Sequence, residues 1–455
     1  MLRLQPCTAI LTTIACSTPL LFACTTWQPL APLPHPPVPA PAWLAEPTDA
    51  TQATHPAPTL DSAPLDLGHL LAYADAHAPA LQMAQAQGVS SRVATVAALH
   101  PLTENPTLDL STGLRAHAGA AALHFELAVH QSFPIAGQPQ HRRDVATASA
   151  HADLAQIAEA RWHLHGEVRR HCAKILGARE RHATAVAVSD LATRYLSLLE
   201  RSLAMGDTPA HELLLARAEL ALGHDEVVAA QDALRLAELE LMALIGWPSH
   251  QPLPLDLPAP PIEVLAAAPE TTADHPLLAA RQRAHIVRRH ELALADSRAW
   301  PDPTIGLGYA HEGSPGPEDA AHTWLLHLGL PLPLWDRHHT ERAQAEVALH
   351  VAAWEEHTAA TALRDALLQS YQATNAAALR VQRYERDILP LIEEHLAALE
   401  RAVALGDSDT LLVFQGQQRL LTALSQHGAA RAAYFEARAH LEALLGADLH
   451  GEPLP

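Results

Sequence analysis

An internal repeat constrains this chain more than any other feature, because it requires two halves with the same architecture. Five short motifs recur along the 455 residues at offsets of 197, 197, 199, 200 and 200, whereas chance matches would scatter. The matching pairs are Ala78–Leu81 with His275–Leu278, Asn105–Leu108 with Asp302–Ile305, Phe133–Ile135 with Leu332–Leu334, Met205–Asp207 with Leu405–Asp407, and Leu244–Gly246 with Leu444–Gly446. We therefore expect two repeats, 61–247 and 271–447, joined by a Pro-rich linker at 248–270 and followed by a tail at 448–455.

Each half contains two short segments in which apolar residues alternate with polar or small ones. This period of two places alternate side chains on opposite faces of a strand. The predicted strands are Thr107–Leu114, Leu123–Phe133, Thr304–Ala310 and Thr323–Leu330. The residues expected on their more apolar faces include Phe125, Leu127, Val129, Trp324, Leu326 and Leu328. Such strands approach the length that crosses a bilayer with tilt, although a soluble four-stranded sheet packed on helices would show the same alternation.

The rest of each half is predicted to be helical, since Ala and Leu dominate these segments. No proline occurs between Pro139 and Pro209, so a helix there would extend about 100 Å at 1.5 Å per residue. Its counterpart in the second half is interrupted only by Pro390, which we expect to kink it. A Gly-Asp turn ends each long helix. The second-half counterpart of the long helix is predicted at Asp336–Leu405. The helices before the strands are predicted at Leu67–Ala98 and Pro276–Ala299, and the returning helices at Pro209–Leu244 and Asp409–Leu445.

The first 60 residues are typical of a bacterial lipoprotein. Arg3 precedes an apolar run that ends in Leu21-Phe22-Ala23-Cys24, which resembles a lipobox. We expect residues 1–23 to be a lipoprotein signal peptide and Cys24 to carry the lipid, with Thr25 favouring the outer membrane. Residues 24–60 would then form a Pro-rich, extended spacer. The alternative is an ordinary signal peptide with a chance cysteine.

Composition and motifs exclude several classes of function. The formal charge of -20 argues against nucleic-acid binding. Because nucleotide-binding and hydrolase motifs are missing, we expect no enzyme and no cofactor. The 31 histidines invite a metal site, but side chains one or two positions apart on a helix do not share a face. We therefore expect no specific site at Trp162–His165, His171-Cys172 or His338-His339.

The order of elements resembles the TolC family of outer-membrane efflux proteins over about residues 61–447. The most characteristic local matches are Ala299–Tyr309 (AWPDPTIGLGY) and Leu328–Arg337 (LGLPLPLWDR). Together with Gly206–Arg217 (GDTPAHELLLAR), they resemble the heavy-metal branch, the outer-membrane partners of cobalt-zinc-cadmium type pumps.

This resemblance implies a mainly α fold with a small β part, in which three copies pool four strands each into a twelve-stranded barrel above a periplasmic helical tunnel. It implies an outer-membrane exit duct of a tripartite pump, with heavy-metal cations as cargo and an inner-membrane, proton-driven RND-type transporter supplying the energy. A periplasmic adaptor protein would contact the helical tips, at Gly206, Asp207, Glu212, Gly406, Asp407 and Asp409. The chain departs from the family at Leu412 and Gln415, where several members carry carboxylates.

Two other functions stay open at this point. A periplasmic His-rich metal-binding lipoprotein would explain the histidines without a duct. An adaptor-like coiled-coil scaffold would explain the long helices, although adaptors have one helical hairpin where this chain has two.

Overall fold

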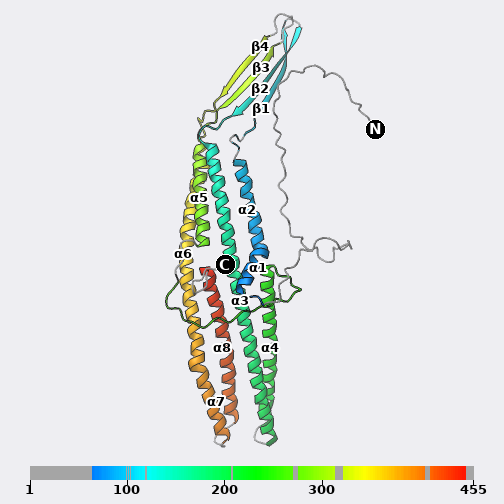
Figure 1. Cartoon of the computed structure of the whole chain (residues 1–455), viewed down its shortest axis with the longest axis vertical. Helices are drawn as coiled ribbons and strands as arrows, with labels where there is room; N and C mark the ends of the chain where they lie inside the picture. Colours follow the sequence, from blue (N-terminus) through cyan, green and yellow to red (C-terminus); the bar gives the residue numbers. More distant parts are fainter. Residues whose placement is uncertain are drawn as a thin grey trace, which may run out of the picture. The chain divides into compact units, whose positions relative to one another are not determined.

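The computed structural model describes residues 64–98, 100, 102, 104–117, 120–205, 209–269, 275–312, 321–404 and 410–446, all within one compact unit. Helices dominate it, and its four strands form a single antiparallel sheet (Figure 1). The first half contains α1 Leu67–His77, α2 Pro79–Ala98, β1 Thr107–His117, β2 Ala120–Ser132, α3 Gln138–Met205 and α4 Ala210–Ile245. The second contains α5 Pro276–Ser297, β3 Thr304–Glu312, β4 Ala321–Gly329, α6 His339–Arg383, the π-helical turn η1 Tyr384–Ile388, α7 Leu389–Ala404 and α8 Thr410–Leu445.

The first predicted helix is wrong as a single element, because the chain breaks between α1 and α2. Ala78 adopts extended geometry with φ -62° and ψ 125°. The ring of Pro79 disfavours helical geometry in the residue before it, and it also suits the first position of a new helix. The same dipeptide position in the second half, His275-Pro276, begins α5 directly.

The 68-residue helix α3 is the longest described element, and α2, α4, α5 and α8 all pack against it. One core cluster joins Val168 and Ile175 of α3 to Leu241 and Ile245 of α4, and all four side chains are fully buried. Full burial of such a side chain stabilises the fold by about 1.5–3 kcal/mol. The α3–α4 hairpin is therefore held by its own apolar seam rather than by helix propensity alone.

The expected interruption at Pro390 takes the form of a π-helical turn rather than a free kink. Pro390 has no N–H to donate to the carbonyl of Arg386, and its ring would clash with that carbonyl in a regular helix. The chain widens into η1 just before this proline and continues as α7. Tyr384 in η1 is buried and its hydroxyl donates to Gln426 of α8 at 2.7 Å, which fixes the turn against the returning helix.

The linker between the halves is tied to the helices by hydrogen bonds. Its first part meets Leu65, whose N–H donates to the Pro254 carbonyl at 2.7 Å. Further along, the buried Tyr434 of α8 donates to the Pro261 carbonyl at 2.9 Å and accepts from the Glu263 N–H at 3.1 Å. Asn375 of α6 then accepts from the Leu265 N–H at 2.8 Å. The Pro-rich segment thus acts as a strap across α6 and α8.

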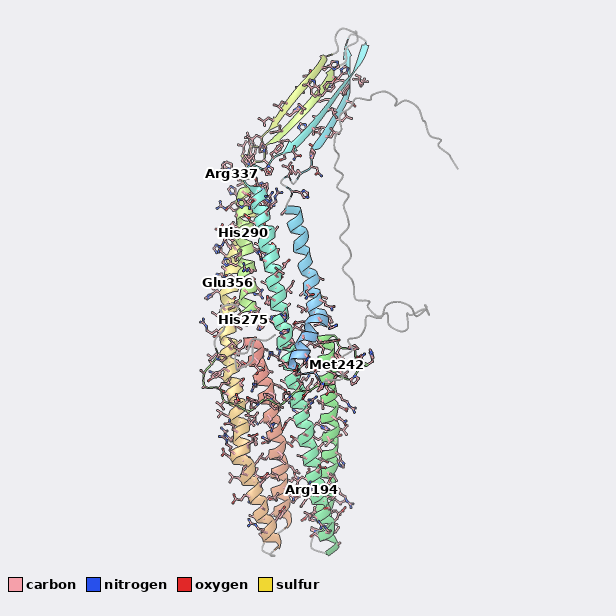
Figure 2. The ribbon with its side chains drawn as sticks, viewed as in Figure 1. Arg194, Met242, His275, His290, Arg337 and Glu356 are labelled. Atoms are coloured by element: carbon pink, nitrogen blue, oxygen red, sulfur yellow. The ribbon has the colours of Figure 1, made fainter. Side chains whose placement is uncertain are left out.

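His275 is the N-cap residue of α5 (Figure 2). This side chain is buried, with Nδ1 accepting from the Leu277 N–H at 3.3 Å and Nε2 donating to the Leu444 carbonyl at 3.0 Å. Both bonds require a neutral ring with its proton on Nε2. Burial, above all, lowers the pKa of His275 below its ordinary 6.5.

We expect the free energy of unfolding to fall as pH drops below about 6.5, because the unfolded chain takes up protons that folded His275 resists. Burial also lowers the pKa of His165, His171 and His440, which adds in the same direction. Urea titrations between pH 7.5 and 5 should show this decline, and His275→Asn, which keeps a capping side chain without a titrating group, should make it shallower. An unchanged slope in that variant would remove His275 from this account.

None of the described helices is both long and apolar enough to cross a membrane.

Candidate functional site

The sheet has one face that is almost entirely apolar and exposed. The strand order is β1-β2-β3-β4, and the register places Val129, Leu307 and Leu326 side by side across three strands. The described residues of this apolar sheet face are Leu108, Leu110, Thr112, Leu114, Leu123, Phe125, Leu127, Val129, Gln131, Ile305, Leu307, Tyr309, His311, His322, Trp324, Leu326 and Leu328, of which Thr112, Gln131, His311 and His322 are polar and the rest are apolar or aromatic. Leu326 and Trp324 are 78% and 70% exposed. Water-soluble chains rarely expose a contiguous apolar surface of this extent.

An aromatic row crosses the apolar sheet face. The rings of Phe125 and Tyr309 lie 6.0 Å apart and those of Tyr309 and Trp324 lie 5.1 Å apart. All six strand residues singled out in the sequence lie on this face; their contact with lipid stays a prediction.

The opposite face, the polar sheet face, combines small residues with histidines and carboxylates. His130 of β2, Gly306 of β3 and His327 of β4 form one row of the register. The two imidazole rings approach to 5.0 Å between centroids in an edge-on arrangement. The Asp109 carboxylate lies 3.4 Å from His130 Nε2, and the Glu126 carboxylate lies 3.9 Å from His327 Nε2.

Two glycines of β3 make this approach of the histidine rings possible. A Cβ atom at Gly306 would lie 2.2 Å from His130 Nδ1, and one at Gly308 would lie 2.7 Å from His327 Nε2. Both distances are far below van der Waals contact, so no larger residue fits without displacing the rings. The Gly-Leu-Gly sequence of β3 therefore provides the floor on which the imidazoles rest.

Sequence reasoning placed His130 and His327 opposite the apolar residues but did not bring them together. They do not occupy equivalent positions in the two halves, because Thr107 pairs with His130 whereas its counterpart Thr304 pairs with Gly329. Only the pairing of β2 with β3, and of β3 with β4, shows that the two rings meet.

Both edges of the sheet lack a partner strand within the described part of the chain. β1 pairs only with β2, and β4 pairs only with β3. An unpaired edge exposes backbone N–H and C=O groups, which is a template for pairing with another chain.

The helical tips are described only in part. Gly206, Asp207, Gly406, Asp407 and Asp409 lie outside the described residues, as does Cys24 with the segments 1–23 and 24–60. Glu212 lies in the first turn of α4, where a carboxylate is favourable.

Near the tips, the α3–α4 and α7–α8 hairpins are joined by a small core. Tyr195 of α3 stacks on Phe414 of α8 with 5.5 Å between ring centroids. Burial, with a further contribution from Glu212, raises the pKa of the Tyr195 hydroxyl. Leu412 is exposed beside this contact. The two hairpins thus pack on each other at Tyr195 and Phe414.

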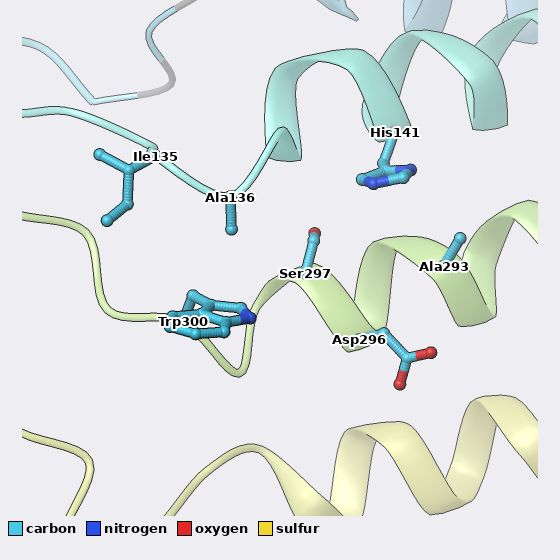
Figure 3. Close-up of a pocket in the computed structure, with 7 residues that line it drawn as sticks. All are labelled: Ile135, Ala136, His141, Ala293, Asp296, Ser297 and Trp300. Atoms are coloured by element: carbon cyan, nitrogen blue, oxygen red, sulfur yellow. The ribbon is translucent and has the colours of Figure 1, made fainter.

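An open crevice of about 630 Å³ lies where the sheet joins the helices (Figure 3). Ile135, His141 and Trp300 line it, and Asp296 on its wall is paired with Arg342 at 3.0 Å. Trp300 is 65% exposed, so an apolar ring meets solvent at this junction. No set of polar groups converges there in the way a small-molecule site requires.

The histidines singled out on the helices pair with acids rather than with one another. His165 lies 2.8 Å from Asp75, and His171 lies 3.7 Å from Glu240. No group of three His, Cys, Asp or Glu side chains among the described residues is arranged to hold a metal ion. Burial raises the pKa of the Cys172 thiol to about 12, so this thiol stays protonated and unreactive.

The comparison with known families decides how this arrangement is understood. Residues 70–247 match the family of outer membrane efflux proteins. The match runs from within α1 to the end of α4, including the first two strands, and the second half has a similar order of elements. No curated protein matches the chain.

Solved structures of outer membrane channels share the fold over most of the chain. The outer membrane protein VceC from Vibrio cholerae has 18% identity and a TM-score of 0.66, and the alignment covers 84% of this chain and 96% of VceC. The open MtrE outer membrane channel of Neisseria gonorrhoeae has 16% identity and a TM-score of 0.63, and the alignment covers 84% of this chain and 89% of MtrE. CusC has 15% identity and a TM-score of 0.59, and the alignment covers 84% of this chain and 92% of CusC.

These findings confirm the predicted fold class, which is mainly α with a four-stranded antiparallel sheet and matches TolC-like outer membrane efflux channels. The family that residues 70–247 match is one of outer membrane efflux proteins and not of enzymes. Because the two faces of the sheet differ in polarity and both sheet edges lack a partner strand in the described part of the chain, we take the sheet as the candidate functional site.

Proposed function

We propose that this chain is the outer-membrane channel subunit of a tripartite efflux pump and forms a passive exit duct. The observation that carries the proposal is the four-stranded sheet with one apolar exposed face, one polar face and two unpaired edges. In a bilayer every backbone polar group needs a partner, so strands that cross it must belong to a closed barrel. A four-stranded sheet cannot close alone, and β4 of one copy pairing with β1 of the next satisfies both edges.

Closure by three copies gives a twelve-stranded barrel with the apolar sheet face toward lipid and the polar sheet face toward water.

A second surface supports contact between copies. Val347, Val351 and Trp354 follow one another at helical spacing on α6 and are 62%, 50% and 67% exposed. A stripe with this spacing is typical of a helix face that packs on another helix, and a second copy of the chain is its proposed occupant.

The proposed setting is the outer membrane, with a lipid on Cys24 as an additional anchor and the helices forming a periplasmic tunnel. The helical tips around 201–217 and 401–417 would meet a periplasmic adaptor, and an inner-membrane RND-type transporter would supply the energy. The packed Tyr195–Phe414 contact supports a single docking end made from both hairpins.

Heavy-metal cations are the proposed cargo. The motifs at 299–309 and 328–337 support this branch, and the net charge of -20 suits cationic cargo. A resident metal-binding lipoprotein is not favoured, because no three-ligand group occurs among the described residues.

Reconstitution of the full-length chain in planar lipid bilayers tests the duct. We expect discrete, long-lived conductance steps, because a closed barrel gives a permanent water path. Absence of conductance from membrane-extracted protein would contradict the proposal.

The cargo needs a separate test. A strain lacking the chain should lose resistance to zinc, cobalt or cadmium salts. Unchanged resistance to these salts, with new sensitivity to organic toxins, would overturn the metal assignment.

A further inference from the structure

We infer that His130 and His327 set the ion selectivity of the duct and make it depend on pH. This inference rests on the proposed function, because it requires the polar sheet face to line the water-filled barrel. The two rings then lie on the inner wall, three pairs in a trimer. Both lie in the register row of Gly306, so each copy contributes two imidazoles to one belt.

The geometry shows that these histidines belong to the wall rather than to loose side chains above it. His130 lies across Gly306, and His327 across Gly308, with no room for a Cβ atom at either glycine. Ala128 lies in the next row of the register beside Gly308, so the floor between the rings is made of small residues. The two rings therefore lie close to the sheet backbone, at the surface that a passing ion would meet.

The charges that face this pair come from all four strands. The described titratable side chains of the polar sheet face are Asp109, His124, Glu126, His130, Glu312 and His327. With neutral imidazoles the carboxylates give this face a negative charge, and with protonated imidazoles the three cations balance the three carboxylates. In β1, Arg115 and His117 continue the same register beyond the described side chains.

Imidazole is the side chain that gains its charge between neutral and mildly acidic pH. A ring of charges in a narrow pore selects ions of opposite sign. We therefore expect cation selectivity at neutral pH and its loss in acid. The carboxylates lie at 3.4 Å and 3.9 Å from separate rings and do not converge on a single point, so the pair regulates charge and does not retain an ion.

The test is the reversal potential of the full-length channel in a potassium chloride gradient, measured at pH 7.5 and 5.5. The ratio of potassium to chloride permeability should fall about threefold or more in acid. In the double variant His130→Gln/His327→Gln the ratio should change much less between the two pH values. The second double variant, His130→Asn/His327→Asn, covers the case in which the glutamine variant fails to assemble.

The matched control is His311→Gln/His322→Gln, which removes two histidines from the same sheet but from the apolar face. It should keep the full pH response of the parent. A parent ratio that does not change with pH, or histidine-free variants that respond like the parent, would overturn this inference while the conductance itself still supports the duct. Failure of every protein to conduct would instead contradict the proposed function.

Discussion

Replacing Leu326 with arginine should abolish assembly of the channel in the membrane. Leu326 lies midway along β4 on the apolar sheet face and is 78% exposed in the single chain. An arginine facing the bilayer interior costs about 2–4 kcal/mol per chain, and a trimer carries three of them. We expect Leu326→Arg to lose the detergent-extracted trimer and the channel conductance.

The neighbouring residue provides the control for this experiment. Leu325 lies on the polar sheet face of the same strand, so Leu325→Arg should assemble and conduct. If the sheet were bathed in water on both faces, an arginine at Leu326 would instead be harmless or would improve solubility. Equal behaviour of the two variants would therefore contradict the assignment of the two faces.

Truncation of Tyr434 should cause the largest loss of stability among the helical positions. Its ring projects from α8, is completely buried and packs in one core cluster with residues of α6. Its hydroxyl makes two hydrogen bonds to the strap at Pro261 and Glu263. Loss of a buried aromatic ring costs about 3–5 kcal/mol. Tyr434→Phe keeps the ring and leaves two backbone groups without partners, which costs about 1–3 kcal/mol.

Urea titrations followed by circular dichroism would measure both losses. Leu236→Ala on α4, where the side chain is 57% exposed, serves as the control and should stay within about 0.5 kcal/mol of the parent. A parent-like Tyr434→Phe would mean that the strap is not held by this hydroxyl. A small loss in Tyr434→Ala would show that the core between α6 and α8 is not a main source of stability.

The order of elements was predictable because each is encoded locally. Alternation over seven or more residues predicted the strands, and the absence of proline predicted the long helix α3. The break at Ala78 was also encoded, in the Ala-Pro dipeptide, but the helical pattern on both sides concealed it. For η1, Pro390 predicted an irregularity in the helix but did not specify that it would be a π-helical turn.

The arrangement of the polar sheet face was not predictable in this way. His130 and His327 meet because β2 pairs with β3 and β3 with β4, and pairing between halves depends on the register of the whole sheet. From the sequence alone, Gly306 and Gly308 would be expected to weaken a strand. The structure shows that they leave room for the rings of His130 and His327. Long-range contacts of this kind depend on tertiary pairing, which no local pattern specifies.

Disulfide trapping between β1 and β4 tests the central claim most directly. Within one chain these edge strands are separated by two others, or about 14 Å at ~4.8 Å per strand, too far for a disulfide, which needs Cα atoms within about 7 Å. Cysteines introduced in pairs along Thr107–Leu114 and Ala321–Gly329 should yield covalent trimers for at least one register, with Cys172 left in place because its thiol is buried. Monomers alone for every pair, in protein extracted from the outer membrane, would contradict a barrel shared between copies.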